Sequence, residues 1–248
     1  MGFQKYLAIY NYHGGGGRGL RRCYDTLSQV DFFDFKRSFI NTRENVRDGY
    51  DQPDYMFYAP VYSSVLEEMI YVAHDYWASA IRYTNYDATS IFVDLGCGSG
   101  KTLISAYESK RFGYVFGIEL LFELSERCNN NIVKLATISG KRKPSVLNLN
   151  VEDQSWASQI ITQCSNSGNS TLFIFNKNSY TSKVVYKTLQ IAESRFNNII
   201  YLYQNPVSAK ILEDNGYECF ASDSRASNAH KNFKYKLFIK QNINIASR

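Results

Sequence analysis

Apolar and polar positions follow different patterns on the two sides of residue 88. After this residue, short apolar runs alternate with longer segments in which apolar residues recur at helical spacing. The apolar runs predict strands over residues 91–95, 114–119, 145–149, 171–175, 198–203, 217–222 and 234–240. Helices are predicted between the first six of these strands. Such an alternation is typical of a parallel sheet with helices on both faces.

The last two predicted strands are joined by a loop rich in Ser, Asn and Ala instead of a helix. They are therefore expected to form an antiparallel hairpin at one edge of the sheet. Before residue 88, apolar residues between positions 61 and 83 recur at helical spacing, and Pro60 marks the start of that helix. We expect an N-terminal extension over residues 1–87, whose helix packs on a single α/β domain over residues 88–248.

A turn rich in glycine follows the first predicted strand. Gly96, Gly98 and Gly100 allow a tight turn with positive φ, and the lack of Cβ atoms lets a ligand approach the backbone. The helix that follows directs its amide groups at the same ligand. The dinucleotide pattern G-x-G-x-x-G is not met, because Lys101 stands three positions after Gly98, and Leu95 stands where a P-loop requires glycine.

The string DLGCGSG, from Asp94 to Gly100, resembles motif I of class I methyltransferases, which bind S-adenosylmethionine. A wider resemblance is to bacterial methyltransferases of largely undefined substrate. These carry, in order, F-D-x-x-x-G-x-x-T, Y-x-P, F-V-D-L-G-C-G-x-G-(K/R), G-x-E-L, F-N-P-F and Y-x-N-P. The corresponding stretches here are FDFKRSFINT (33–42), YAP (58–60), FVDLGCGSGK (92–101), GIEL (117–120), FNKN (175–178) and YQNP (203–206).

The resemblance implies a Rossmann-like class I methyltransferase fold. In this fold a seven-stranded, mostly parallel sheet has its last strand inserted antiparallel between the fifth and sixth strands. The segment around Thr42 and Tyr58 would form an N-terminal helical lid over the cofactor. The residues expected to bind S-adenosylmethionine are Asp94, Gly96, Cys97, Gly98, Gly100, Glu119, Leu120, Asn150, Val151 and Asp153.

Two of these assignments have alternatives. Glu119 ends the second strand, where its carboxylate can accept both ribose hydroxyls without a competing donor, although a helix N-terminus would also favour the charge. Residues Asn150 to Asp153 follow the third strand, where related enzymes bracket the adenine. Which of them meets the base is open, and Asp153 has the alternative role of capping the next helix.

The residues expected at the methyl-transfer site are Asn176, Tyr180 and Tyr58. Here the sequence departs from the family, because FNKN lacks the proline and the aromatic residue of F-N-P-F. The alternative role for Asn176 is a strand-end amide that ties two loops together. Because the cofactor's sulfonium is a strong electrophile, the protein mainly has to align the acceptor. A general base is needed only for a hydroxyl or a protonated amine.

Composition narrows the class of protein and its expected compartment. With 44% hydrophobic residues, 21% charged residues and no apolar run near ~20 residues, a soluble protein without a membrane span is expected. Nothing near the N-terminus directs export, so the expected compartment is the cytoplasm. The five cysteines form no CxxC pair, which disfavours a disulfide framework and a metal site. Basic clusters such as residues 141–143 are more often solvated surface than nucleic-acid sites.

Three hypotheses follow. The first is S-adenosylmethionine-dependent methyl transfer to a small-molecule or glycan-like acceptor that the lid would enclose. The second is a methyltransferase acting on RNA or protein, which predicts a charged groove leading to Asn176. The third is a catalytically silent protein that binds the cofactor, which the altered FNKN loop suggests. The sequence does not distinguish O- from N-methylation, and no pattern fixes the oligomeric state.

Overall fold

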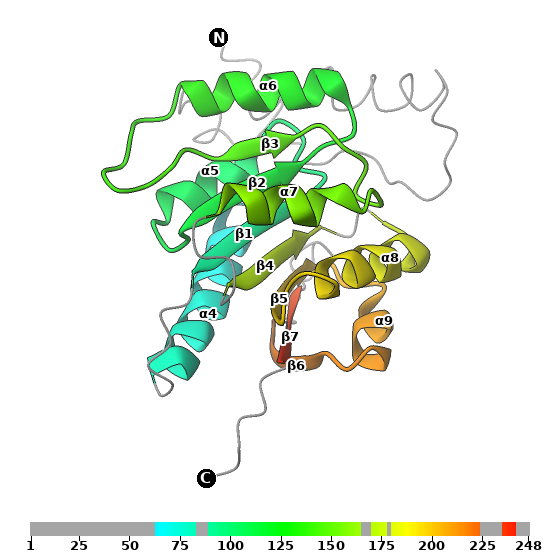
Figure 1. The fold of residues 1–248 in the computed structure, drawn as a ribbon. Coiled ribbons are helices and arrows are strands. Elements are labelled where there is room, and N and C mark those ends of the chain that lie inside the picture. The colour runs from blue at the N-terminus through cyan, green and yellow to red at the C-terminus, as the bar shows by residue number, and fades with distance from the viewer. Residues whose placement is uncertain (1–62, 83–88, 165–169, 178–179, 224–234, 242–248) are drawn as a thin grey trace, which may run out of the picture.

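A computed structural model describes residues 63–82, 89–164, 170–177, 180–223 and 235–241 (Figure 1). The predicted lid, with Thr42 and Tyr58, lies outside the described residues. The strands are β1 (Ser90–Leu95), β2 (Tyr114–Ile118), β3 (Ser145–Leu147), β4 (Thr171–Asn176), β5 (Asn198–Gln204), β6 (Glu218–Asp223) and β7 (Tyr235–Gln241). Each begins and ends within two residues of its predicted bounds.

The strands form one seven-stranded sheet in the order β3-β2-β1-β4-β5-β7-β6. Strands β1 to β5 pair in parallel, whereas β7 is antiparallel to both β5 and β6. The last strand is thus inserted between the fifth and the sixth, and the predicted class I methyltransferase fold is confirmed. The hairpin at the sheet edge is confirmed as well.

Helices cover both faces of the sheet, as the alternation of strand and helix predicted. They are α4 (Ser63–Arg82), α5 (Lys101–Glu108), α6 (Phe122–Val133), α7 (Ser155–Gln163), α8 (Ser182–Glu193) and α9 (Ala209–Asp214). Buried residues of α4, α5 and α6 belong to one apolar cluster, and those of α7, α8 and α9 belong to a second cluster on the other face. None of the helices in the described ranges has the length and apolar character needed to cross a membrane.

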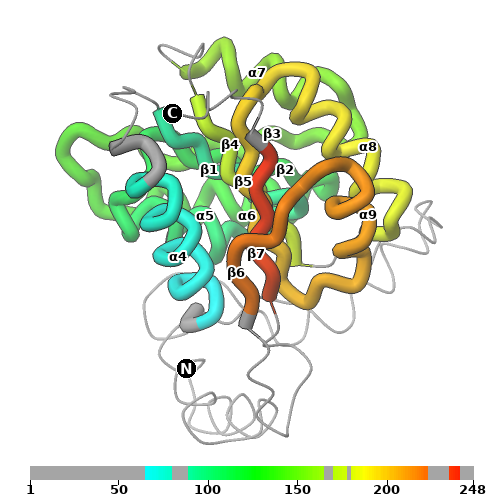
Figure 2. The backbone as a smooth tube through the Cα atoms, turned by 90° about the horizontal axis from the view of Figure 1, so that it is seen from below, coloured from blue at the N-terminus to red at the C-terminus, as the bar shows by residue number. Residues whose placement is uncertain are grey.

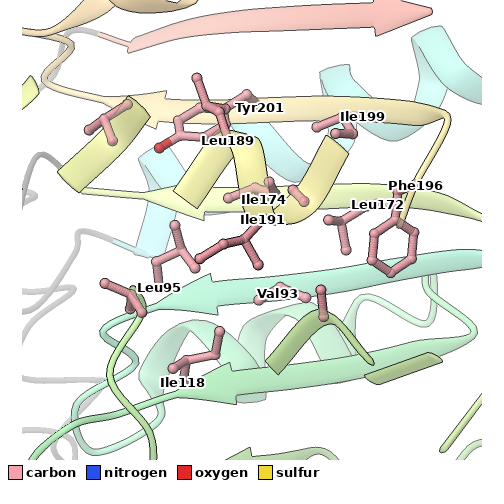
Figure 3. Packing of buried hydrophobic residues seen from close by; sticks show 14 of the residues in the cluster. Val93, Leu95, Ile118, Leu172, Ile174, Leu189, Ile191, Phe196, Ile199 and Tyr201 are labelled. Carbon is pink, nitrogen blue, oxygen red and sulfur yellow. The ribbon is translucent and has the colours of Figure 1, made fainter. Parts of the chain in front are cut away.

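The two clusters take alternate residues of each central strand. In β1, Val93 belongs to the cluster beneath α7–α9, and Phe92 belongs to the cluster beneath α4–α6. Figure 3 shows Val93, Ile174 and Tyr201 packed in the first of these clusters, across three neighbouring strands. Because both faces are buried, these strands appear in the sequence as continuous apolar runs instead of alternating ones.

Helix α4 packs on the sheet, as its apolar periodicity predicted. Its Trp77 donates a hydrogen bond from Nε1 to Thr171 Oγ1 at the start of β4 (2.9 Å). Its Glu68 accepts one from the hydroxyl of Tyr235 in β7 (3.1 Å). In Figure 2, α4 lies beside β6 and β7, although these elements are at opposite ends of the described chain. The helix therefore joins the N-terminal part of the chain to the last strands.

The bond between Trp77 and Thr171 gives a test of this docking. We expect Trp77→Phe and Thr171→Val each to lower the free energy of unfolding. The double variant should lose about 1 kcal/mol less than the sum of the two single losses, because the bond is lost only once. Chemical denaturation of the four proteins measures this coupling. Strict additivity would show that the hydrogen bond adds nothing to the docking.

Candidate functional site

The predicted site residues that the structure describes lie at or just after the carboxyl ends of strands β1 to β4. Strands β1 and β4 are neighbours there, but the chain continues from β1 towards β2 and β3, and from β4 towards β5. In open α/β sheets, ligands bind outside the carboxyl ends of two strands that diverge in this way. The glycine turn after β1 lies at this point, beside the segment that follows β4. We refer to this place as the β1/β4 crevice.

The turn after β1 adopts the conformation that its glycines permit. Gly96, Gly98 and Gly100 have φ values of 74°, 54° and 89°, in the left-handed region that other residues rarely enter. The amides of Gly96 and Cys97 both donate to the carbonyl of Ile118 at the end of β2 (2.8 and 3.0 Å). The turn is thus anchored to the neighbouring strand through backbone groups.

Glu119 provides a second anchor. One carboxylate oxygen accepts from the Gly98 amide (2.8 Å) and the other from the Leu121 amide (2.9 Å). Leu120, between Glu119 and Leu121 in the chain, is half-buried. Its carbonyl accepts a hydrogen bond from Asn148 Nδ2 (3.1 Å). The Leu120 amide is a third hydrogen-bond partner of this carboxylate. Since a carboxylate has about four lone-pair positions, Glu119 retains capacity for a ligand hydroxyl. Burial raises the pKa of this carboxyl, and the amide hydrogen bonds oppose that rise.

Tyr180 reaches the same turn from the segment that precedes α8. A Cβ atom on Gly96 would lie 2.5 Å from the Tyr180 hydroxyl oxygen, so a side chain at this position would require Tyr180 to move. The ring of Tyr180 is buried, with 6% of the residue exposed. The structure therefore brings together two residues that the sequence analysis placed in different subsites.

Helix α6 supports the far side of the turn. Asn131 donates from Nδ2 to the carbonyl of Ser99 (2.9 Å), and the sulfur of Cys128 occupies the space that a side chain at Gly100 would need. Cys97 is hydrogen-bonded to Cys128, and this bond and burial together raise the pKa of the Cys97 thiol. Its side chain lies in the apolar core and is a neutral thiol, so it adds packing and not a nucleophile to the site.

Asp94 is the last polar side chain of β1 and is only 3% exposed. Burial raises the pKa of its carboxyl well above the ordinary value of 3.8, and the negative charge of Glu119 adds to the rise. A hydrogen bond with the Thr102 side chain and the positive charge of Lys177 act in the opposite direction. The carboxylate therefore needs positive partners to remain ionised in this place.

Polar side chains of the loop after β3 form hydrogen bonds with nearby backbone amides. Asn150 accepts the Glu152 amide on Oδ1 (2.9 Å), and Asp153 accepts the Ser155 amide on Oδ1 (2.7 Å). The second bond joins Asp153 to Ser155, the first residue of α7, and lowers the pKa of the exposed Asp153 carboxyl. Val151 is buried in the core. The N-cap position of α7 is Gln154, which makes no side-chain cap, so Asp153 contacts the start of the helix from one residue earlier. Adenine binding by this loop stays a prediction.

Asn176 is entirely buried at the end of β4. Its Nδ2 donates to the hydroxyl of Tyr201 in β5 (2.9 Å), on the face of the sheet that α7–α9 cover. Burial raises the pKa of the Tyr201 hydroxyl, which is therefore neutral. The bond ties β4 to β5 and not one loop to another, as the alternative role had it, and a part in methyl transfer stays a prediction. Tyr58, the third predicted catalytic residue, lies outside the described residues.

Two residues of the crevice were missed by the sequence analysis. Thr102 bonds to Asp94 from the first turn of α5, and Lys177 is near enough to Asp94 for its charge to act on that carboxyl. Strand alternation gave a signal for Lys177, because it lies two positions after Phe175 and four after Phe173, which share one face of β4. In the part of the chain that the structure describes, no cluster of His, Cys, Asp or Glu is arranged to hold a metal ion.

Comparison with known proteins gives distant structural neighbours. No protein-family model matches the sequence, and no curated protein matches it either. Magnesium protoporphyrin IX methyltransferase from Synechocystis PCC 6803, solved with S-adenosylmethionine, is 11% identical, with a TM-score of 0.47 over 96% of this chain and 97% of its own. Ribosomal protein L11 methylase from Lactobacillus delbrueckii subsp. bulgaricus is 12% identical, with a TM-score of 0.41 over 70% of this chain and 76% of its own.

A third structure, TrmK of M. capricolum with S-adenosylhomocysteine, is 13% identical, with a TM-score of 0.42 over 63% of each chain. At these identities and scores, the assignment of the fold rests on the strand order of the sheet. That order defines the class I methyltransferase fold for this chain.

The contact between Gly96 and Tyr180 predicts a specific cost for a side chain. Gly140 has the same φ of 74° but open space around it, so Gly140→Ala measures the conformational cost alone. We expect Gly96→Ala to lower the free energy of unfolding by roughly 1–3 kcal/mol more than Gly140→Ala does. Tyr180→Phe, which removes the blocking oxygen, should cancel most of this excess. Equal costs for the two alanine variants in chemical denaturation would disprove the contact.

The raised pKa of Asp94 predicts how stability depends on pH. The unfolded chain loses the Asp94 proton near the ordinary pKa of 3.8, whereas the folded protein keeps it to a higher pH. Between these two values the unfolded state binds fewer protons, so wild-type stability falls as pH rises. We therefore expect Asp94→Asn to gain stability relative to the wild type as pH is raised above about 4. Urea denaturation across this pH range measures the difference, and a constant difference would contradict the prediction.

Proposed function

We propose that this protein transfers a methyl group from S-adenosylmethionine to a small-molecule or glycan-like acceptor. The observation that carries the proposal is the placement of Glu119. Its carboxylate is fixed at the end of β2 by the Gly98 and Leu121 amides, directly beside the glycine turn and the β1/β4 crevice. A fixed acceptor pair next to a bare backbone suits the ribose of a bound nucleoside.

Residues on three sides of the crevice suit the parts of this cofactor. Glu119 would accept the ribose hydroxyls, and the backbone at Gly98, whose amide contacts Glu119, would lie against the ligand. Asp94, buried and in need of positive partners, suits an ammonium group. When bound, the cofactor supplies an electrophilic methyl group on a sulfonium, and the protein's task is then mainly alignment.

Tyr180 is the described side chain best placed to align an acceptor. Its hydroxyl lies against Gly96 in the turn, and its buried ring limits the positions that this hydroxyl can take. A positioned hydroxyl can orient an acceptor or exclude water from the crevice. Tyr180 is therefore proposed as a positioning residue for the reaction.

One observation favours a second candidate function, cofactor binding without turnover. The amide of Asn176 is turned to the face beneath α7–α9 and bonds to Tyr201, away from Asp94 on the opposite face. By the family resemblance, Asn176 would instead line the methyl-transfer site. A measurement of turnover therefore distinguishes the two candidates, because both of them predict cofactor binding.

Calorimetric titration with S-adenosylmethionine and S-adenosylhomocysteine tests the shared part of both candidates. We expect saturable binding to the wild type, and at least a tenfold weaker affinity for Glu119→Ala because two charge-assisted bonds are lost. Glu123→Ala, an exposed residue in the first turn of α6, is the matched control and should bind normally. Thermal unfolding of each variant reports whether it is folded.

Absence of binding by folded wild-type protein would reject the methyltransferase proposal and the silent binder together. Binding accompanied by methyl transfer to any member of an acceptor library, followed with a radiolabelled methyl group, would select the enzyme.

A further inference from the structure

Lys177 and Asp94 lie on the same side of the sheet at the β1/β4 crevice. In the parallel pairing of these strands, Asp94 is the register partner of Phe175. Phe92 in β1 and Phe173 and Phe175 in β4 all face the cluster beneath α4–α6. Alternation within β1 gives Asp94 the side of Phe92, and Lys177, the first residue after β4, continues the side of Phe175 if the chain stays extended for one more residue. The two charged residues therefore continue the same face where the strands end.

Their charges are close enough to interact. The ammonium of Lys177 stabilises the ionised carboxylate of Asp94, which burial otherwise disfavours. Lys177 itself is half-buried, so its charge is only partly screened by solvent. At the edge of the crevice, a buried carboxyl that needs a positive partner to ionise thus stands near one positive group on a longer and more adaptable side chain.

A pair of opposite charges on one face matches a ligand that carries both charges on one carbon. The α-ammonium and the α-carboxylate of an amino acid are such a pair. S-adenosylmethionine ends in this group, and its ribose would be held by Glu119, next to Gly98 in the same turn. The crevice thus offers a group of opposite charge to each of the two charged groups at the amino-acid end of that molecule.

We propose that Lys177 binds the α-carboxylate of the cofactor, while Asp94 binds its α-ammonium. This inference rests on the proposed function and specifies one more contact of that site. It also gives a role to the departure of FNKN from F-N-P-F, since the position of the lost proline carries the carboxylate-binding charge. Lys177 is in this view a cofactor-binding residue and not a base for the acceptor.

Three ligands separate this role from others. S-adenosylhomocysteine carries both charged groups, its decarboxylated analogue S-adenosyl-3-thiopropylamine keeps only the ammonium, and 5′-methylthioadenosine has neither. For Lys177→Gln we expect about tenfold weaker binding of S-adenosylhomocysteine, because a charge-assisted contact is lost. Binding of the decarboxylated analogue should change less than about twofold. Calorimetry at fixed ionic strength measures all three affinities.

Lys183→Gln serves as the control for a general loss of positive charge. Lys183 is exposed in the first turn of α8, six positions along the chain, and its substitution should change none of the affinities. Asp94→Asn should weaken both ligands that carry the ammonium and leave 5′-methylthioadenosine unaffected.

Each remaining outcome counts against the proposal. If Lys177→Gln weakens the binding of the two charged ligands equally, Lys177 acts only through Asp94. If the substitution weakens the binding of neither ligand, the charge of Lys177 serves the acceptor or the fold. In both cases the proposed methyltransferase function stands. If folded wild type binds no nucleoside ligand at all, the proposed function fails and this inference fails with it.

Discussion

The turn after β1 is confined by groups from β2, α6 and the segment before α8, and the candidate site depends on this confinement. Glu119 fixes the Gly98 amide, the Tyr180 hydroxyl closes the space above Gly96, and the Cys128 sulfur closes the space beside Gly100. The glycines are therefore required by packing within the protein as well as by the approach of a ligand. Because the anchors come from β2, α6 and the segment before α8, the turn holds its shape only when both faces of the sheet are covered.

Most of the fold was predictable because strands that are buried on both faces appear in the sequence as continuous apolar runs. Strands such as β1 and β4 are apolar at nearly every position, and their bounds were predicted within a residue. The antiparallel insertion of β7 came only from the family resemblance, because apolar runs do not specify pairing. The lid predicted around Tyr58 lies outside the described residues and stays a prediction.

The site was predictable to the level of its backbone and less so for its side chains. The glycine turn and Glu119 have recognisable spacing, and the structure brings them together. The direction of a side chain at a strand end is harder to predict. Asn176 bonds to Tyr201 beneath α7–α9, whereas the charge of the adjacent Lys177 acts on Asp94. The family motif drew attention to Asn176, whereas alternation from Phe175 would have drawn it to Lys177. Motif matching identifies positions, and strand geometry decides which of them face the crevice.

The two buried clusters have a practical consequence for observing this protein. The chain contains two tryptophans, and they lie on opposite faces of the sheet. Trp156 of α7 is fully buried in the cluster beneath α7–α9. Trp77 of α4 is partly buried and packs against the cluster beneath α4–α6. The indole rings therefore have different exposure to water and different quenching neighbours. Each side of the sheet carries its own fluorophore, so replacing either indole by phenylalanine leaves an emission signal that reports on one layer of helices alone.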